Sequence, residues 1–216
     1  MSRGHTRLLV LAKEPVPGRV KTRLSPPCTL EEAAAIARAA LLDTLDTVLA
    51  LDLPIALVID GDPGSWVPPG IELVPQRGRG LDERLAAAFE DAGAPAVLVG
   101  MDTPQMTRDL LSGAVESLWR VGTDCVLGQA EDGGWWCIGL RKADPAVFLG
   151  IPMGTSFTGA VQLRRLRALG LRCFQLPRLR DVDGFEDAVA VAAGIPGSRF
   201  ASTVLPIAER LESVPR

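Results

Sequence analysis

Histidine and cysteine are scarce in this chain, and their scarcity excludes several kinds of functional site. The 216 residues include a single histidine, His5, and four cysteines, none of which stands in a C-x-x-C spacing. Histidine-based catalytic triads and histidine-rich metal sites therefore lack their residues, and a structural zinc site is not expected. Any metal must be held by oxygen atoms, so the expected cofactor is Mg²⁺ or Mn²⁺.

The chain also lacks long hydrophobic runs and a basic segment that leads into an apolar one. A membrane-spanning helix needs about 20 apolar residues, and a secretory leader begins with such a basic segment, so we expect no membrane association and a cytoplasmic location. No repeat, linker or low-complexity segment interrupts residues 1–216, which predicts a single domain. The formal net charge is −3 without a broad basic stripe, so we expect no nucleic-acid partner.

The common nucleotide-binding motifs are missing as well. Residues 18–22, G-R-V-K-T, resemble part of a P-loop, but the glycine that should directly precede the lysine is absent. No G-x-G-x-x-G follows the first predicted strand. The sequence therefore supports neither a Walker-type NTPase nor a nicotinamide-dependent enzyme.

One short segment is strongly basic. Residues 8–12 are typical of a fully buried strand, and Pro15, Pro17 and Gly18 then end it, so the cations lie on a loop at its carboxyl end. Open α/β sheets bind ligands at that edge. Cations interrupted by prolines and a glycine favour a phosphorylated ligand over the alternative, a solvated face with scattered ion pairs. These cations are Lys13, Arg19, Lys21 and Arg23.

The remaining chain alternates between strand and helix patterns, which predicts a largely parallel sheet. Thr29 and Glu32 form a capping box, and apolar residues at helical spacing continue from there to Val48. Further helices are expected over 81–91, about 107–119 and around 160–169, and from Glu186. Further strands are expected over 55–59, 71–74, 96–99, 125–127, 135–140 and 172–176.

Carboxylates follow several of these strands. Asp60 and Asp62 follow one strand and Asp102 follows another, and parallel strands bring their carboxyl ends to one edge. Asp102, on a tight turn before a Thr-Pro pair, is expected to bind a cation that bridges phosphates, and capping is the alternative. Later, Asp181 and Asp183 stand at alternating positions ahead of a helix. One is expected to point into the site, and helix capping is the alternative for the other.

Five segments, in order, resemble the signature of a known family. They are A-K-E-P-V-P-G-R-V-K-T-R-L, G-L-D-E-R-L, V-G-M-D-T-P, A-E-D-G-G-W-W-C-I-G-L and L-R-D-V-D-G-F-E-D-A. The chain is similar to a bacterial glycosyltransferase-A-like family, named as radical-SAM/selenodomain-associated or arsenosugar-pathway transferases, of the nucleotide-diphospho-sugar transferase superfamily. It is more distantly similar to phospholactate guanylyltransferase and molybdenum cofactor guanylyltransferase. The implied fold is a single three-layer α/β/α domain with a mostly parallel twisted sheet.

The resemblance also implies roles for individual residues. The four cations become the nucleotide-phosphate loop, Asp102 and Asp183 become metal ligands, and Arg84 faces the site unless a surface salt bridge holds it. The acceptor region is implied to contain Glu131, Asp132, Gly133 and Gly134, with the two glycines letting the backbone approach the ligand.

This chain departs from the family pattern at four positions that bear on the acceptor. Met101 stands where a small polar residue is usual, and Asp82 where glycine is usual. Trp135 and Trp136 replace tyrosines. Successive strand residues face opposite ways, so one tryptophan is expected in the core and the other is a candidate to stack on a sugar or base. Core packing of both is the preferred expectation.

The implied activity is a divalent-metal-dependent transfer from a nucleotide-activated donor to a small-molecule acceptor. Glycosyl transfer from a nucleotide sugar is the leading expectation, with Asp132 taking a hydroxyl proton and Asp102 and Lys21 acting at the leaving phosphate. The alternative is nucleotidyl transfer from a nucleoside triphosphate onto a phosphorylated metabolite with release of pyrophosphate, because four cations suit a triphosphate. A non-catalytic nucleotide-sugar-binding protein is a third hypothesis, and a homodimer stays open.

Overall fold

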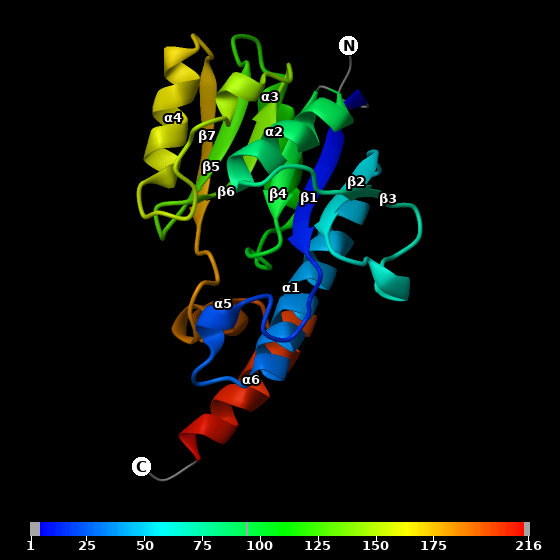
Figure 1. The fold of residues 1–216 in the computed structure, drawn as a ribbon, viewed down its shortest axis with the longest axis vertical. Helices are drawn as coiled ribbons and strands as arrows, with labels where there is room; N and C mark the ends of the chain where they lie inside the picture. The colour runs from blue at the N-terminus through cyan, green and yellow to red at the C-terminus, as the bar shows by residue number, and fades with distance from the viewer. Residues whose placement is uncertain (1–4, 94, 214–216) are drawn as a thin grey trace.

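The computed structural model describes residues 5–93 and 95–213, and one seven-stranded sheet forms its centre (Figure 1). The strand order is β3-β2-β1-β4-β6-β5-β7. Neighbouring strands are parallel except at β6, which is antiparallel to both β4 and β5. The strands are β1 (Arg7–Lys13), β2 (Ile55–Asp60), β3 (Glu72–Pro75), β4 (Ala96–Gly100), β5 (Cys125–Ala130), β6 (Trp135–Leu140) and β7 (Cys173–Leu179).

The reversed direction of β6 follows from its short connection. Residues 131–134 alone join β5 to β6. A parallel pair needs a crossover of about a dozen residues or more, so strands joined by such a turn run antiparallel. The prediction of a largely parallel sheet is confirmed, and every predicted strand is present. Strand β7 continues to Leu179, past the expected end at residue 176.

Helices cover both faces of the sheet, which confirms the three-layer architecture. Side chains of α1 and α3 pack into one core cluster, and side chains of α2 and α4 pack into another. The predicted capping box opens α1, since the Thr29 amide donates to Glu32 at 2.9 Å and the Glu32 amide to the Thr29 hydroxyl at 3.2 Å. None of the helices in the described residues has the length and hydrophobicity to cross a bilayer. The helices are α1 (Leu30–Leu49), α2 (Leu81–Ala92), α3 (Arg108–Leu118), α4 (Thr158–Ala168), α5 (Phe185–Gly194) and α6 (Arg199–Glu212).

A third core cluster lies beyond the edge of the sheet. Helices α5 and α6 pack there against one another and against α1, well away from the strands (Figure 1). Leu24, from the basic loop, and Val182, from the segment after β7, are both buried in this cluster. Helix α6 was not among the predicted elements. The cluster fixes the two segments that carry the predicted phosphate and metal residues.

Core packing at β5 and β6 gives a test of the fold. Gly128 on β5 faces Trp136 on β6, and a Cβ at residue 128 would lie 2.5 Å from the indole ring, which is 1% exposed. Gly128→Ala should therefore destabilise the protein by about 1–3 kcal/mol through overpacking. Gly113→Ala in α3, where a Cβ meets nothing within 4 Å, is the matched control and should stabilise the protein by up to about 1 kcal/mol. Denaturant unfolding of both variants measures this, and equal stability would refute the packing argument.

Candidate active site

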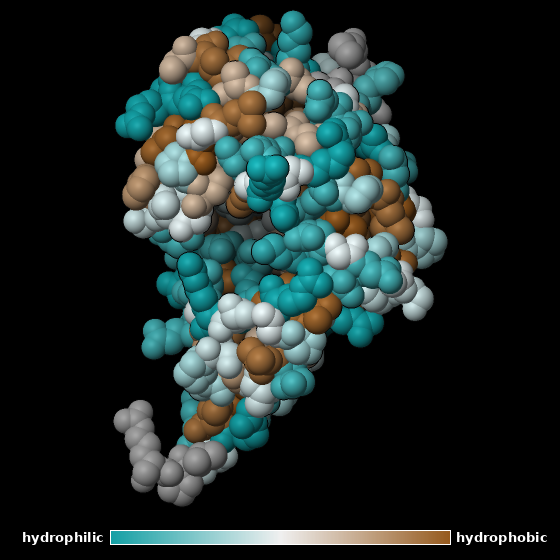
Figure 2. Space-filling model, viewed as in Figure 1, coloured by the Kyte–Doolittle hydropathy of each residue, from teal (hydrophilic) through white to brown (hydrophobic). Residues whose placement is uncertain are grey.

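A pocket of about 820 Å³ lies at the carboxyl ends of β1 and β4. Figure 2 shows the molecule hollowed between the sheet and the helices beyond its edge, with hydrophilic residues around the opening. Parallel strands bring loops from distant parts of the sequence to this edge. Nine of the predicted site residues line the pocket: Lys13, Arg19, Lys21, Arg23, Arg84, Asp102, Asp132, Gly134 and Asp183.

Lys21 lies deepest among the four cations of the loop. Its Nζ is 2.7 Å from Asp102 Oδ1 and also donates to the Val182 carbonyl. Burial lowers the pKa of Lys21, but the carboxylates of Asp102, Asp181 and Asp183 outweigh burial and raise that pKa above its ordinary value. Lys21 is therefore charged at neutral pH and already paired with a carboxylate.

The other three loop cations are exposed and differ in their partners. Arg23 pairs with Asp183. Lys13 and Arg19 form no ion pair with any of the described residues, and both line the pocket. Arg79, which precedes α2, is likewise exposed and unpaired in that part of the chain. Lys13, Arg19 and Arg79 are thus the cations with free hydrogen-bond donors toward an incoming anion.

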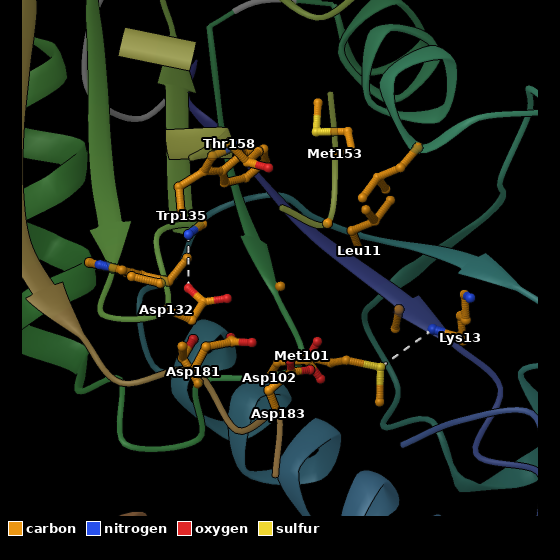
Figure 3. A pocket seen from close by; sticks show the side chains of 18 of the residues that line it. Leu11, Lys13, Met101, Asp102, Asp132, Trp135, Met153, Thr158, Asp181 and Asp183 are labelled. Carbon is orange, nitrogen blue, oxygen red and sulfur yellow. Dashed lines mark hydrogen bonds between the residues drawn. The ribbon is translucent and has the colours of Figure 1, made fainter. Parts of the chain in front are cut away.

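Asp181 is the most perturbed acid of the pocket. Its burial, followed by the charges of Asp102, Asp132 and Asp183, raises the pKa of Asp181 to about 7, although Lys21 opposes the change. Figure 3 shows the Asp132 and Asp181 carboxyl groups directed into the pocket, with Asp102 and Asp183 nearby. Four carboxyl groups therefore share one space around a single buried ammonium.

Arg84 lines the pocket, but its guanidinium is already engaged. Its Nη1 is 2.7 Å from Asp60 Oδ2 and 3.1 Å from Gln76 Oε1. The Gln76 amide nitrogen in turn donates to the carbonyls of Ala12 and Val58. The hydrogen bond from Arg84 to Asp60 lowers the pKa of Asp60. The salt-bridge alternative for Arg84 is therefore realised, and this network holds the ends of β1 and β2 against the start of α2.

The turn between β5 and β6 holds Asp132 in place. The Gly134 amide donates to Asp132 Oδ1 at 2.8 Å. Gly133 has φ 92°, and a Cβ there would lie 1.8 Å from the Ser156 carbonyl oxygen, so its missing side chain makes room for residue 156. Gly133 itself is not among the lining residues. Glu131, also assigned to the acceptor region, pairs with Arg180 at 3.1 Å and does not line the pocket.

Trp135 and Trp136 lie on opposite faces of β6, as the alternation of side chains along a strand requires. Trp136 is 1% exposed, packs in the core and donates from its indole to the Pro177 carbonyl at 3.0 Å. Trp135 is partly buried and lines the pocket from the opposite face of β6. Trp135 also packs against the core cluster that contains side chains of α2 and α4, so both tryptophans contact the core and Trp135 in addition faces the pocket.

Met101 and Asp82, the other two residues that depart from the family pattern, make contacts within the protein. Met101 is 7% exposed, and its sulfur accepts a hydrogen bond from the Lys13 amide at 3.4 Å. Asp82 Oδ2 accepts a hydrogen bond from the Gly150 amide at 3.0 Å. This bond joins the start of α2 to the segment that leads into α4.

The pocket suits a divalent cation by its donor chemistry. Its acidic side chains Asp102, Asp132, Asp181 and Asp183 offer oxygen atoms, which hard cations such as Mg²⁺ and Mn²⁺ prefer, while Lys21 lies among them. Thr103 Oγ1, one residue from Asp102, is buried without a hydrogen-bond partner among residues 5–93 and 95–213. In the same residues, no three histidine, cysteine, aspartate or glutamate side chains are already grouped as a metal site. Asp102 and Asp183, the expected ligands, both line the pocket and are paired here with Lys21 and Arg23.

Several lining residues were missed by sequence reasoning. The sequence predicts Asp181 only as one of a pair with Asp183, and no sequence signal marks Gln76 or Arg79 as site residues. The segment with Gly154, Thr155 and Ser156 also lines the pocket. Its run of glycine and small polar residues was the one available signal, because such clusters mark loops.

Comparison with known proteins assigns the chain to a family. The model of the family described as an uncharacterized protein conserved in bacteria (DUF2064) matches residues 35–155. The chain belongs to this family. One similar crystal structure is of a protein from Desulfovibrio desulfuricans G20 that is provisionally described as a nucleotide-diphospho-sugar transferase. It is 30% identical to this DUF2064 member, the alignment covers 95% of each chain, and the TM-score is 0.84. A comparison with curated proteins found no match.

More distant structures share the fold of this DUF2064 protein. A cytidylyltransferase from Leptospira borgpetersenii is 11% identical, with 96% of this chain and 95% of that chain covered and a TM-score of 0.56. The 2-C-methyl-D-erythritol 4-phosphate cytidylyltransferase from Thermus thermophilus is 16% identical, with 87% and 97% covered and a TM-score of 0.50. The predicted nucleotide-diphospho-sugar transferase fold is confirmed.

The raised pKa of Asp181 predicts how the stability of this DUF2064 protein depends on pH. Folding raises that pKa from about 4 in an unfolded chain to about 7. Between these values the native state binds more protons than the unfolded state, so the free energy of unfolding falls as the pH rises through this window. Asp181→Asn removes the carboxyl group and with it the free-energy cost of ionising Asp181 in the folded protein. Above pH 8 its Tm should exceed that of the wild type by at least about 4 °C, because one pKa unit is about 1.4 kcal/mol and each kcal/mol shifts Tm by about 2–4 °C.

Thermal unfolding from pH 4.5 to 8.5, with a chelator present, measures this difference. Asp52→Asn, at an exposed position with φ 51° that asparagine tolerates, is the control and should leave the pH profile unchanged. A Tm difference between Asp181→Asn and wild type that is the same at every pH would contradict the assignment.

Proposed function

We propose that this protein is a divalent-metal-dependent transferase that uses a nucleotide-activated donor and transfers a glycosyl group from a nucleotide sugar to a small-molecule acceptor. The observation that carries the proposal is the meeting of unpaired cations and clustered carboxylates in one pocket at the carboxyl edge of the sheet. The relative from Desulfovibrio desulfuricans, provisionally described as a nucleotide-diphospho-sugar transferase, supports the same class.

The donor diphosphate is proposed to bind at the basic side of the pocket. Lys13, Arg19 and Arg79 are exposed there and have no carboxylate partner in the described chain. Their donors are therefore available to phosphate oxygens without breaking an ion pair. The Lys21 ammonium is paired with Asp102, so its charge balances part of the carboxylate charge that would otherwise repel the donor.

Asp102 and Asp183 are proposed to hold the metal ion. When bound, a divalent cation supplies positive charge to the phosphate oxygens of the leaving group. Lys13 and Arg19 act in the same direction, because fixed positive charges stabilise a transition state in which negative charge moves onto the leaving diphosphate. The Thr103 hydroxyl, buried without a partner in the described chain, is a further donor or acceptor at this place.

Asp132 is proposed as the general base. One of its oxygens is held by the Gly134 amide, and its carboxyl group is directed into the pocket (Figure 3). In the transfer, the acceptor O–H bond breaks and its proton goes to Asp132. The acceptor oxygen bonds to the anomeric carbon, and the bond from that carbon to the phosphate oxygen breaks. Its electron pair leaves on the nucleoside diphosphate.

Nucleotidyl transfer with release of pyrophosphate is the second candidate. The three unpaired cations at the rim favour it, because they match the charge of a triphosphate. The pairing of Lys21 with Asp102 and of Arg23 with Asp183 weighs against it, since the four cations of the loop are not all available to phosphates.

The proposal predicts metal-dependent stabilisation by nucleotide sugars. A ligand that binds only the native state raises Tm, by about 2.7 kcal/mol of stabilisation at 100 times its Kd. We expect one or more of a panel of UDP-, GDP-, ADP-, CDP- and dTDP-sugars to raise Tm by about 5 °C or more with Mn²⁺ and by much less without it. The corresponding triphosphates should give smaller shifts.

Asp102→Asn should abolish the metal-dependent part of this shift, while Asp52→Asn, at the opposite end of the sheet, should keep it. If the metal-dependent Tm shift with a nucleotide sugar persists in Asp102→Asn, Asp102 does not bind the metal ion. A larger shift with a triphosphate would favour the second candidate, and no shift with any nucleotide would refute both.

A further inference from the structure

The positive charge of the pocket comes from two stretches of the chain. Six lysine and arginine residues line the pocket, and they lie either at the end of β1 and in the loop after it or at residues 79–84. Beyond Arg84, no lysine or arginine of the described residues lines the pocket. The lining residues of the β5–β6 turn, the segment before α4 and the segment after β7 therefore include no lysine or arginine, although the Lys21 ammonium reaches the Val182 carbonyl. This lining is called the cation-free side below. The six are Lys13, Arg19, Lys21, Arg23, Arg79 and Arg84.

The cation-free side is apolar over part of its surface. Trp135 and Met153 line it, both partly buried against the core cluster beneath. Leu11, on β1, and Leu81, which is 44% exposed at the start of α2, continue this apolar surface toward the basic side of the pocket. Figure 3 shows Trp135, Met153 and Leu11 around one part of the pocket, apart from the carboxylates. This set of residues, Leu11, Leu81, Trp135 and Met153, is called the apolar wall below.

Close backbone contacts fix the segment that carries Met153. The Gly159 amide donates to the Gly133 carbonyl at 2.8 Å, and the Thr158 hydroxyl donates to the Pro152 carbonyl at 2.8 Å. A Cβ on Gly133 or Gly159 would collide with the backbone of the opposite segment. The wall beside Asp132 is thus held in place before a ligand arrives, which reduces the ordering cost of binding.

Charge determines which acceptor fits beside this wall. The carboxyl groups near it belong to Asp132 and Asp181, and both are directed into the pocket (Figure 3). A phosphate on the acceptor would add negative charge beside these carboxylates, and the nearest cations, Lys21 and Arg23, are already paired with Asp102 and Asp183. A neutral hydroxyl group meets no such repulsion and can donate its proton to Asp132.

We infer that the apolar wall is the acceptor subsite and that the acceptor is an uncharged hydroxyl compound with an apolar ring that packs against Trp135 and Met153. This inference rests on the proposed function, because it assigns the second substrate of that transferase. It names an acceptor class that nucleotidyl transfer onto a phosphorylated metabolite does not use.

Titration calorimetry with matched neutral and phosphorylated probes tests the inference without turnover. The probes are 2-naphthol, cyclohexylmethanol and 2-naphthyl phosphate. At least one neutral probe should bind, and 2-naphthyl phosphate should bind at least about tenfold more weakly than 2-naphthol. Trp135→Ala should weaken the binding of the neutral probe by about tenfold, in line with the loss of an aromatic contact and its buried area. Trp66→Ala, a partly buried tryptophan outside the pocket lining, is the control and should bind like the wild type.

A second variant keeps the test independent of how well Trp135→Ala folds. Ser156 is exposed, lines the pocket near Asp132 and makes no side-chain hydrogen bond among the described residues. Ser156→Lys places a cation on the cation-free side, so it should raise the affinity for 2-naphthyl phosphate by at least about fivefold. Its affinity for a nucleoside diphosphate should be unchanged.

Binding of the neutral probe should also persist with saturating Mn²⁺ and nucleoside diphosphate, tested over UDP, GDP, ADP, CDP and dTDP. Displacement by a diphosphate would assign the apolar wall to the nucleotide base and overturn the inference. So would tighter binding of the phosphorylated probe, unchanged binding by Trp135→Ala, or no binding of either neutral probe. Failure of the proposed function is separate, because it appears as the absence of any metal-dependent nucleotide binding.

Discussion

The ammonium group of Lys21 is the contact on which the pocket depends. It joins the loop after β1 to Asp102 at the end of β4 and to the Val182 carbonyl beyond β7, and the Val182 amide donates to the Asp102 carbonyl at 3.0 Å. Lys21 adopts a left-handed conformation with φ 46°, which costs a non-glycine residue about 1–2 kcal/mol. These contacts offset that cost and hold three distant segments around one space.

Negative and positive charges are distributed unevenly in the pocket, and this distribution determines where each part of a substrate can bind. Four carboxyl groups surround one buried ammonium, so the centre of the pocket is short of positive charge. A divalent cation would balance that deficit, whereas the unpaired cations lie at the rim, toward an incoming diphosphate. Trp135 and Met153 of the apolar wall belong to lining segments without a lysine or arginine. One pocket thereby presents separate chemical environments for a charged donor and an uncharged acceptor.

The sequence predicted most of the sheet because its strands are continuous apolar runs and its helices have regular spacing. It also located the basic loop and Asp102, since both directly follow such strands. It did not distinguish Asp181 from Asp183, because residues two apart in an extended segment share a face and only tertiary burial separates them. Arg79 and the 153–156 segment lie on loops without periodicity, and α6 is stabilised by contacts with α1 and α5. A local sequence pattern does not predict such tertiary contacts.

Transfer from a nucleotide sugar is the central claim, and ³¹P NMR of the reaction products tests it most directly. The protein is incubated with Mn²⁺ and either nucleotide sugars or nucleoside triphosphates, with 2-naphthol, cyclohexylmethanol or a sugar phosphate as acceptor. We expect nucleoside diphosphate to be released from a nucleotide sugar in the presence of a neutral acceptor, and that signal to be lost in Asp102→Asn. Pyrophosphate released from a triphosphate with the sugar phosphate, and no nucleoside diphosphate from any nucleotide sugar, would contradict the claim.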